Sequence, residues 1–133
     1  MRQVLRNRRR QAAVAVEMAV VLPLLLMILF GVIEFGWAFT VRQAVVSAAR
    51  EGARVASLPG STETEIETRI AGFMEPLGLT TYQTTITRAT SANPTEVVRV
   101  AIPYRDVTLV GGFFGSTAGN INATCSMRKE GQP

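Results

Sequence analysis

The chain has 133 residues and a formal net charge of +4, and 47% of its residues are hydrophobic. A chain of this length can build one small core but not two. It contains no histidine, which excludes histidine-based catalytic triads and imidazole metal sites. Cys125 is the single cysteine, so no disulfide can form within the chain.

The excess positive charge is concentrated at the N-terminus. Residues 1–10 contain five arginines and no acid, whereas nine basic and eight acidic residues occur from Arg42 onward. A nucleic-acid-binding domain needs a basic face, so we expect no nucleic-acid partner. Arginines beside a membrane segment stay in the cytoplasm, and we therefore interpret residues 1–10 as a cytoplasmic basic tail.

A long apolar segment covers residues 11–41, where the only charges are those of Glu17 and Glu34. As a helix it would be roughly 45 Å long, which exceeds the roughly 30 Å of hydrocarbon in a lipid bilayer. No small-residue cleavage site lies at its end, so we expect a retained single-pass anchor and not a secretory signal. The preceding arginines predict that the C-terminal domain is exported.

The two glutamates of this segment are about 25 Å apart along a helix, so each can lie near one face of the membrane. For Glu17 a second interpretation stays open, because a charge inside a membrane seeks a partner and a neighbouring subunit could supply one. Pro23 removes one helix hydrogen bond. It is either an ordinary proline of a membrane helix or a position at which the helix can bend during assembly.

Small side chains recur at every fourth position after the membrane segment, at Ala44, Ala48, Gly52 and Ala56. On a helix they form one narrow ridge, which lets another backbone come close. The ridge could pack on the chain's own sheet or on another subunit, and the two arrangements are compatible. This pattern predicts a helical extension over residues 42–58.

The extension also carries charged side chains at Arg50, Glu51 and Arg54. Glu51 and Arg54 have the spacing of a helical ion pair, which contributes about 0.3 kcal/mol when it is exposed to solvent. The sequence Leu58-Pro59-Gly60 ends the helix.

The sequence pattern of residues 59–133 predicts a small exported α+β domain. A second helix is expected from about Glu63 to Glu75, with Ser61 or Thr62 as its cap. Three strands are predicted: the threonine-rich stretch Tyr82–Thr90, and the stretches Val98–Tyr104 and Ile121–Met127, in which apolar residues alternate. A turn before the second strand makes the first two a hairpin, and we expect an antiparallel sheet with helices on one face. The glycine-rich stretch Val107–Gly115 either tucks under the sheet or contacts a membrane or partner.

Three motifs, taken in this order and at this spacing, resemble the TadE-like family of pilin-like proteins. They are E-x-A-x-x-x-P from Glu17 to Pro23, I-E-F-G from Ile33 through Glu34 and Phe35 to Gly36, and A-A-R-E-G-A-R from Ala48 to Arg54. The resemblance is firm over Ala13 to Arg54 and loose over the rest of the chain.

The resemblance implies a pilin-like subunit of a Tad/Flp-type pilus or secretion apparatus in the bacterial inner membrane. Its partners would be the lipid bilayer and other pilin-like or Tad-apparatus subunits, with no cofactor and no small-molecule substrate. The N-terminus is also similar to the type IV pilin signal, which a prepilin peptidase cuts five residues before the glutamate. The matching cut lies between Ala12 and Ala13, although that family prefers glycine where this chain has Ala12. Glu17 would then meet the new N-terminal amine of an adjacent subunit.

Two other function classes compete with the pilin-like subunit. The chain could be a membrane-tethered binding module of the exported space that belongs to no filament. Catalysis is not expected, because the exported acids, hydroxyls and Cys125 form no spaced constellation that a reaction class needs. We therefore predict no catalytic, cofactor-binding or metal-binding residues.

Overall fold

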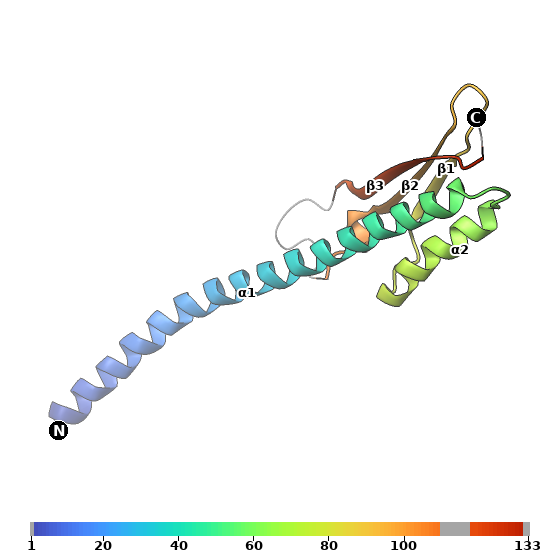
Figure 1. Cartoon of the computed structure of the whole chain (residues 1–133). Helices are drawn as coiled ribbons and strands as arrows, with labels where there is room; N and C mark the ends of the chain where they lie inside the picture. Colours follow the sequence, from blue (N-terminus) through green and yellow to red (C-terminus); the bar gives the residue numbers. More distant parts are fainter. Residues whose placement is uncertain (1, 110–117, 132–133) are drawn as a thin grey trace. The chain divides into compact units, whose positions relative to one another are not determined.

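The structure is a computed structural model, which describes residues 2–109 and 118–131 and the side chains of residues 11–109 and 118–131. The main elements are, in order, α1 (Arg2–Ser57), α2 (Glu63–Met74), β1 (Gln83–Thr87), β2 (Thr95–Pro103) and β3 (Asn120–Arg128). Short 3-10 helices follow α2 and β2, at η1 (Glu75–Leu77) and η2 (Tyr104–Asp106). These elements confirm the predicted α+β class, with a long N-terminal apolar helix, a second helix and a small antiparallel sheet (Figure 1).

The chain divides into two compact units, Met1–Phe35 and Gly36–Pro133, which we call the first and second units. The described part of the first unit lies wholly within α1. Pro23 stands inside this helix and does not end it. The second unit contains the rest of α1 together with α2 and the sheet.

Helix α2 begins at a capping box, and its cap is Thr62, one of the two residues that the sequence predicted. The Glu65 amide donates to Thr62 Oγ1 at 3.3 Å, and the Thr62 amide donates to the Glu65 carboxylate at 2.9 Å. These two bonds satisfy amides that have no partner within the helix. The buried side chains Ile66, Ile70 and Met74 recur every fourth residue, so one stripe of α2 faces the core.

The sheet has the order β1-β2-β3, and both neighbouring pairs are antiparallel. The predicted hairpin is present, and its turn is closed by reciprocal backbone hydrogen bonds between Thr90 and Asn93. All three strands differ from the expected bounds at both ends: β2 begins three residues earlier than expected, at Thr95, and β3 is one residue longer at each end. β1 is shorter than Tyr82–Thr90, and Tyr104 belongs to η2 because the chain leaves the sheet after Pro103.

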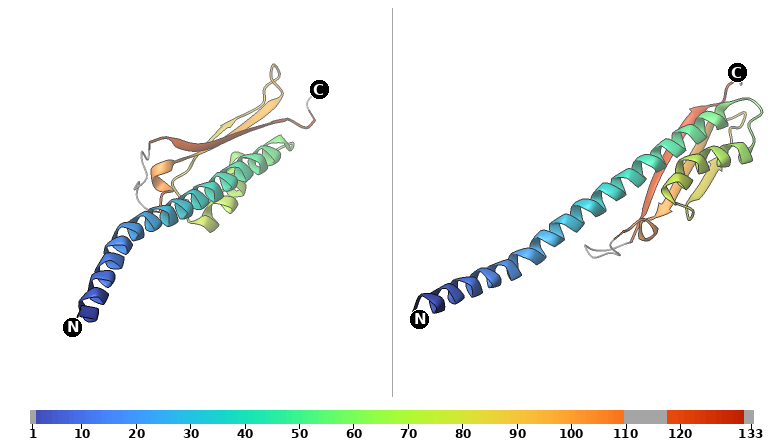
Figure 2. Two further views of the ribbon diagram at one scale, coloured as in Figure 1. Left: turned by 90° about the vertical axis from the view of Figure 1, so that its left-hand side faces the viewer. Right: turned by 90° about the horizontal axis from the view of Figure 1, so that it is seen from below.

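The core of the second unit lies between the helices and one face of the sheet (Figure 2). Val98, Val100 and Ile102 of β2 are fully buried, whereas the alternate residues of β1 and β3 that face outward are exposed. Burial of this apolar surface is the main stabilising term, at about 25 cal/mol per Å². Of the predicted loop Val107–Gly115, Val107 is buried and residues 110–115 lie outside the described residues.

Candidate functional site

Large apolar side chains lie exposed along α1 in the first unit. Val14 is 57% exposed, Leu24 59% and Phe35 75%. An exposed apolar surface of this extent indicates a membrane or a protein partner. Within the described part of the chain, α1 is the one helix that is long and apolar enough to cross a membrane.

The residues of the predicted peptidase site and the first glutamate lie on this helix. Ala12, Ala13, Glu17 and Pro23 are all exposed. Glu17 forms no ion pair with any side chain among residues 11–109 and 118–131. The Glu17 carboxylate can therefore form an ion pair with a positive group that lies outside the described side chains.

The second family motif divides into residues with different surroundings. Glu34 is 9% exposed, whereas Phe35 beside it is mostly exposed. A Cβ atom built on Gly36 would meet nothing within 4 Å. Packing among the described residues therefore does not require a glycine at this position.

The small ridge of α1 packs inside the second unit. Ala44 is half-buried, and the other three ridge residues are buried. A Cβ atom on Gly52 would lie 3.0 Å from Ile70 Cδ1 in α2 and 3.2 Å from Val98 Cγ1 in β2. The ridge thus lets α2 and the sheet approach the α1 backbone, and three of its four positions are already occupied by the chain itself.

Glu51 of α1 pairs with Arg54 of the same helix and with Arg69 of α2, and the second contact joins the two helices. Its Oε1 atom lies 2.7 Å from Arg54 Nη2 and 2.8 Å from Arg69 Nη2. Hydrogen bonds lower the pKa of Glu51 to about 2, and the bond from Arg54 has a larger effect than the bond from Arg69. Sequence spacing indicated Arg54, but Arg69 comes from another helix and was missed. Arg50, the third charged residue of the extension, is exposed.

We expect acid to weaken this link between α1 and α2. The pKa of Glu51 is lower in the folded chain than the value of about 4.3 in unfolded peptides. Its stabilisation is therefore fully present above about pH 4.3 and is lost as the pH falls toward the folded pKa of about 2. The arginine side chains are 55% and 54% exposed, so solvent screening limits the effect to about 1 kcal/mol at most.

The measurement is the unfolding free energy of the detergent-solubilised chain as a function of pH, for the unmodified protein and for Glu51→Gln. The difference between the two should shrink as the pH falls below about 4. Glu67→Gln, which removes an exposed acid of α2, serves as the control. A difference for Glu51→Gln that does not change with pH would contradict the assignment.

A buried ion cluster at the C-terminal end of α1 was also missed from the sequence. Glu96 is 1% exposed, and its Oε1 atom lies 3.2 Å from Lys129 Nζ. Arg88 Nε lies 3.7 Å from the second carboxylate oxygen. Lys129 Nζ also donates to the Ala56 carbonyl at 2.9 Å, and Arg88 donates to the Ser61 carbonyl at 2.7 Å. The cluster therefore links the end of α1 and the turn after it to β2 and to the residues that directly follow β1 and β3.

Comparisons with known proteins bear on the N-terminal part of the chain. No curated protein and no solved structure matches the chain. A family model described as TadE-like protein matches residues 12–54. This range contains all three sequence motifs and covers most of α1. Residues 12–54 thus carry the signature of the TadE-like family, and the resemblance that the motifs indicated is confirmed.

Proposed function

We propose that the chain is a membrane-anchored, pilin-like subunit that takes part in assembling a Tad/Flp-type pilus or secretion apparatus. The observation that carries this proposal is the coincidence of the TadE-like match with the exposed apolar surface of α1. A helix with such a surface can insert in lipid and pack against other helices of the same kind. Its contribution to assembly is packing and not a chemical reaction.

The basic tail sets the proposed orientation. Its five arginines favour a cytoplasmic N-terminus, which leaves the second unit outside the cytoplasm. The membrane is then the bacterial inner membrane, where Tad systems are anchored. The partners are lipid and other pilin-like or Tad-apparatus subunits.

Glu17 has the central role in the proposed packing. It is an exposed carboxylate on an apolar helix, and a charge inside a membrane normally pairs with a partner. The new N-terminal amine of a neighbouring subunit supplies that partner if a prepilin peptidase cuts between Ala12 and Ala13. N-terminal sequencing of membrane-extracted protein should therefore show that the mature chain begins at Ala13.

Replacing Glu17 with alanine should reduce co-purification with other pilin-like subunits at least about tenfold, because a hydrogen bond to a charged group contributes about 1.5–3 kcal/mol. The experiment compares the amounts of partner recovered from detergent-solubilised membranes that contain equal amounts of each variant. Glu67→Ala, which changes an exposed acid of α2, should recover as much partner as the unmodified chain. Equal recovery with Glu17→Ala, from uncut chains, would favour a membrane-tethered binding module outside any filament. Recovery of the native chain as freely soluble protein would refute both functions.

A further inference from the structure

The outer edge of β3, among the residues that the structure describes, is unpaired and lacks most of the features that normally protect a strand edge. No strand among residues 2–109 and 118–131 pairs with it. Its register with β2 is continuous from Asn120 to Arg128, without a bulge. The stretch from Asn120 to Met127 contains neither a charge nor a proline. Long edges of this kind bind further strands, and proteins usually block them with charges, prolines, bulges or short strands.

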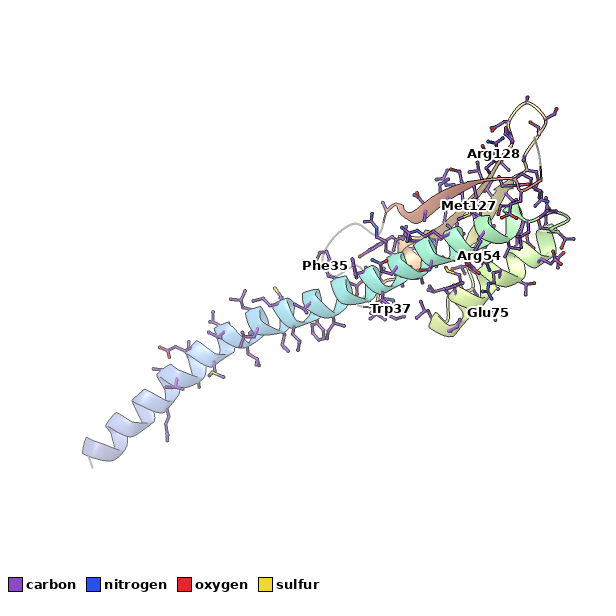
Figure 3. The ribbon with its side chains drawn as sticks, in the orientation of Figure 1. Phe35, Trp37, Arg54, Glu75, Met127 and Arg128 are labelled. Carbon is purple, nitrogen blue, oxygen red and sulfur yellow. The ribbon has the colours of Figure 1, made fainter. Side chains whose placement is uncertain are left out.

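The core-facing side of β3 is also incompletely covered. Ile121, Cys125 and Met127 are half-buried, although they lie in the same rows as fully buried residues of β2. Figure 3 marks Met127 near the end of this strand. A fourth strand beside β3 would pair its free backbone groups and cover this apolar row together.

The opposite edge of the sheet is formed by β1, which has the complementary direction. β1 and β3 are both antiparallel to β2, so they run parallel to each other. Two copies that stand side by side in the same orientation therefore present β1 of one to β3 of the other as parallel neighbours. β1 (Gln83–Thr87) is uncharged as well, so this contact brings no like charges together.

We propose that the β3 edge of the second unit binds the β1 edge of a second copy of this chain. The inference rests on the proposed function in one respect, since insertion in one membrane gives the copies their common orientation. The two edges are different surfaces, so the contact is head-to-tail and leaves a free β1 and a free β3 at the ends of each dimer. Contacts of this kind continue into a ring or an open array.

The chain offers a direct test through its single cysteine. Cys125 lies opposite Val98, and Val98 lies opposite Ile86 of β1. Within one chain, β1 and β3 are two strand spacings apart, roughly 9.5 Å, which exceeds the Cα separation of about 7 Å that a disulfide allows. A disulfide between Cys125 and a cysteine placed in β1 must therefore join two copies.

The experiment introduces Thr84→Cys or Ile86→Cys, which lie on the same face of the sheet as Cys125, and oxidises native membranes with copper phenanthroline. At least one of the two variants should give a ladder of dimers, trimers and larger species on a non-reducing gel. Adding Cys125→Ser should abolish the ladder. Thr85→Cys, whose side chain points to the opposite face, is the matched control and should give no ladder.

The outcomes separate this inference from the proposed function. Membrane-inserted chains that give no ladder with either variant overturn the edge contact and leave the anchored subunit intact. A single dimer band from the unmodified chain, through Cys125 alone, would indicate antiparallel pairing of two β3 strands and would also overturn it. Chains that are absent from the membrane fraction refute the proposed function instead.

Discussion

Replacing Glu96 with alanine is expected to lower the unfolding free energy of the second unit by about 3–5 kcal/mol. The carboxylate is almost fully buried, and Lys129, whose side chain is 14% exposed, lies beside it. The substitution leaves this ammonium group buried without its counter-ion. It also leaves a small void under the end of α1. Because single domains are stable by only about 5–15 kcal/mol, this loss is a large part of the total.

A double substitution distinguishes the loss of the counter-ion from the loss of packing. Glu96→Leu with Lys129→Met replaces the pair by apolar side chains, and exchanges of this kind are often close to neutral. Some polar atoms of the cluster lack hydrogen bonds even in the unmodified protein. Arg88 Nη1 and Glu96 Oε2 are buried without hydrogen bonds among the described residues. The double variant should therefore be more stable than Glu96→Ala in denaturant unfolding of the solubilised chain. A loss below about 0.5 kcal/mol for Glu96→Ala, the range of ordinary surface changes, would contradict the prediction.

The order and type of the elements could be predicted because local patterns determine them. The cap at Thr62 and the four-residue spacing of Ile66 and Ile70 specify α2 whatever packs against it. The alternation of Val98, Val100 and Ile102 specifies β2 in the same way. Element ends were less accurate: β1 ends at Thr87 although β2 extends two residues beyond its partner Val97, so the end is set by where the chain of β1 leaves the sheet.

The ion contacts could be predicted only where both partners belong to one element. Glu51 and Arg54 are one helical turn apart, but Arg69 is 18 residues from Glu51 in sequence, and only folding brings it near. The burial of Glu96 could have been predicted from the sequence, but its ion partners could not. This residue has the same parity as the inward-facing residues of β2, so the alternation places it in the core. Its partners could not be identified from that pattern, because Arg88 and Lys129 come from outside β2.

Replacing Gly52 with leucine is expected to destabilise the second unit by about 3 kcal/mol. A Cβ atom at this position would already lie 3.0 Å from both Cγ1 and Cδ1 of Ile70 and 3.2 Å from Val98 Cγ1. Leucine adds three further carbon atoms in the same space, where the core is filled by fully buried side chains. Overpacking of a filled core costs about 1–3 kcal/mol and occasionally more. The gain in helix propensity over glycine, about 1 kcal/mol, is too small to offset it.

The same substitution at Gly72 provides the matched control. Gly72 is an exposed position inside α2, and a Cβ atom there would meet nothing within 4 Å. Gly72→Leu should therefore raise the unfolding free energy by up to about 1 kcal/mol, since leucine favours the helix over glycine. Opposite signs for the two variants, measured by denaturant unfolding under one set of conditions, would show that close approach of α2 and β2 to α1 requires the glycine. Equal stabilisation of both variants would mean that the ridge does not face the core, and the small residues of α1 would then be free to contact another subunit.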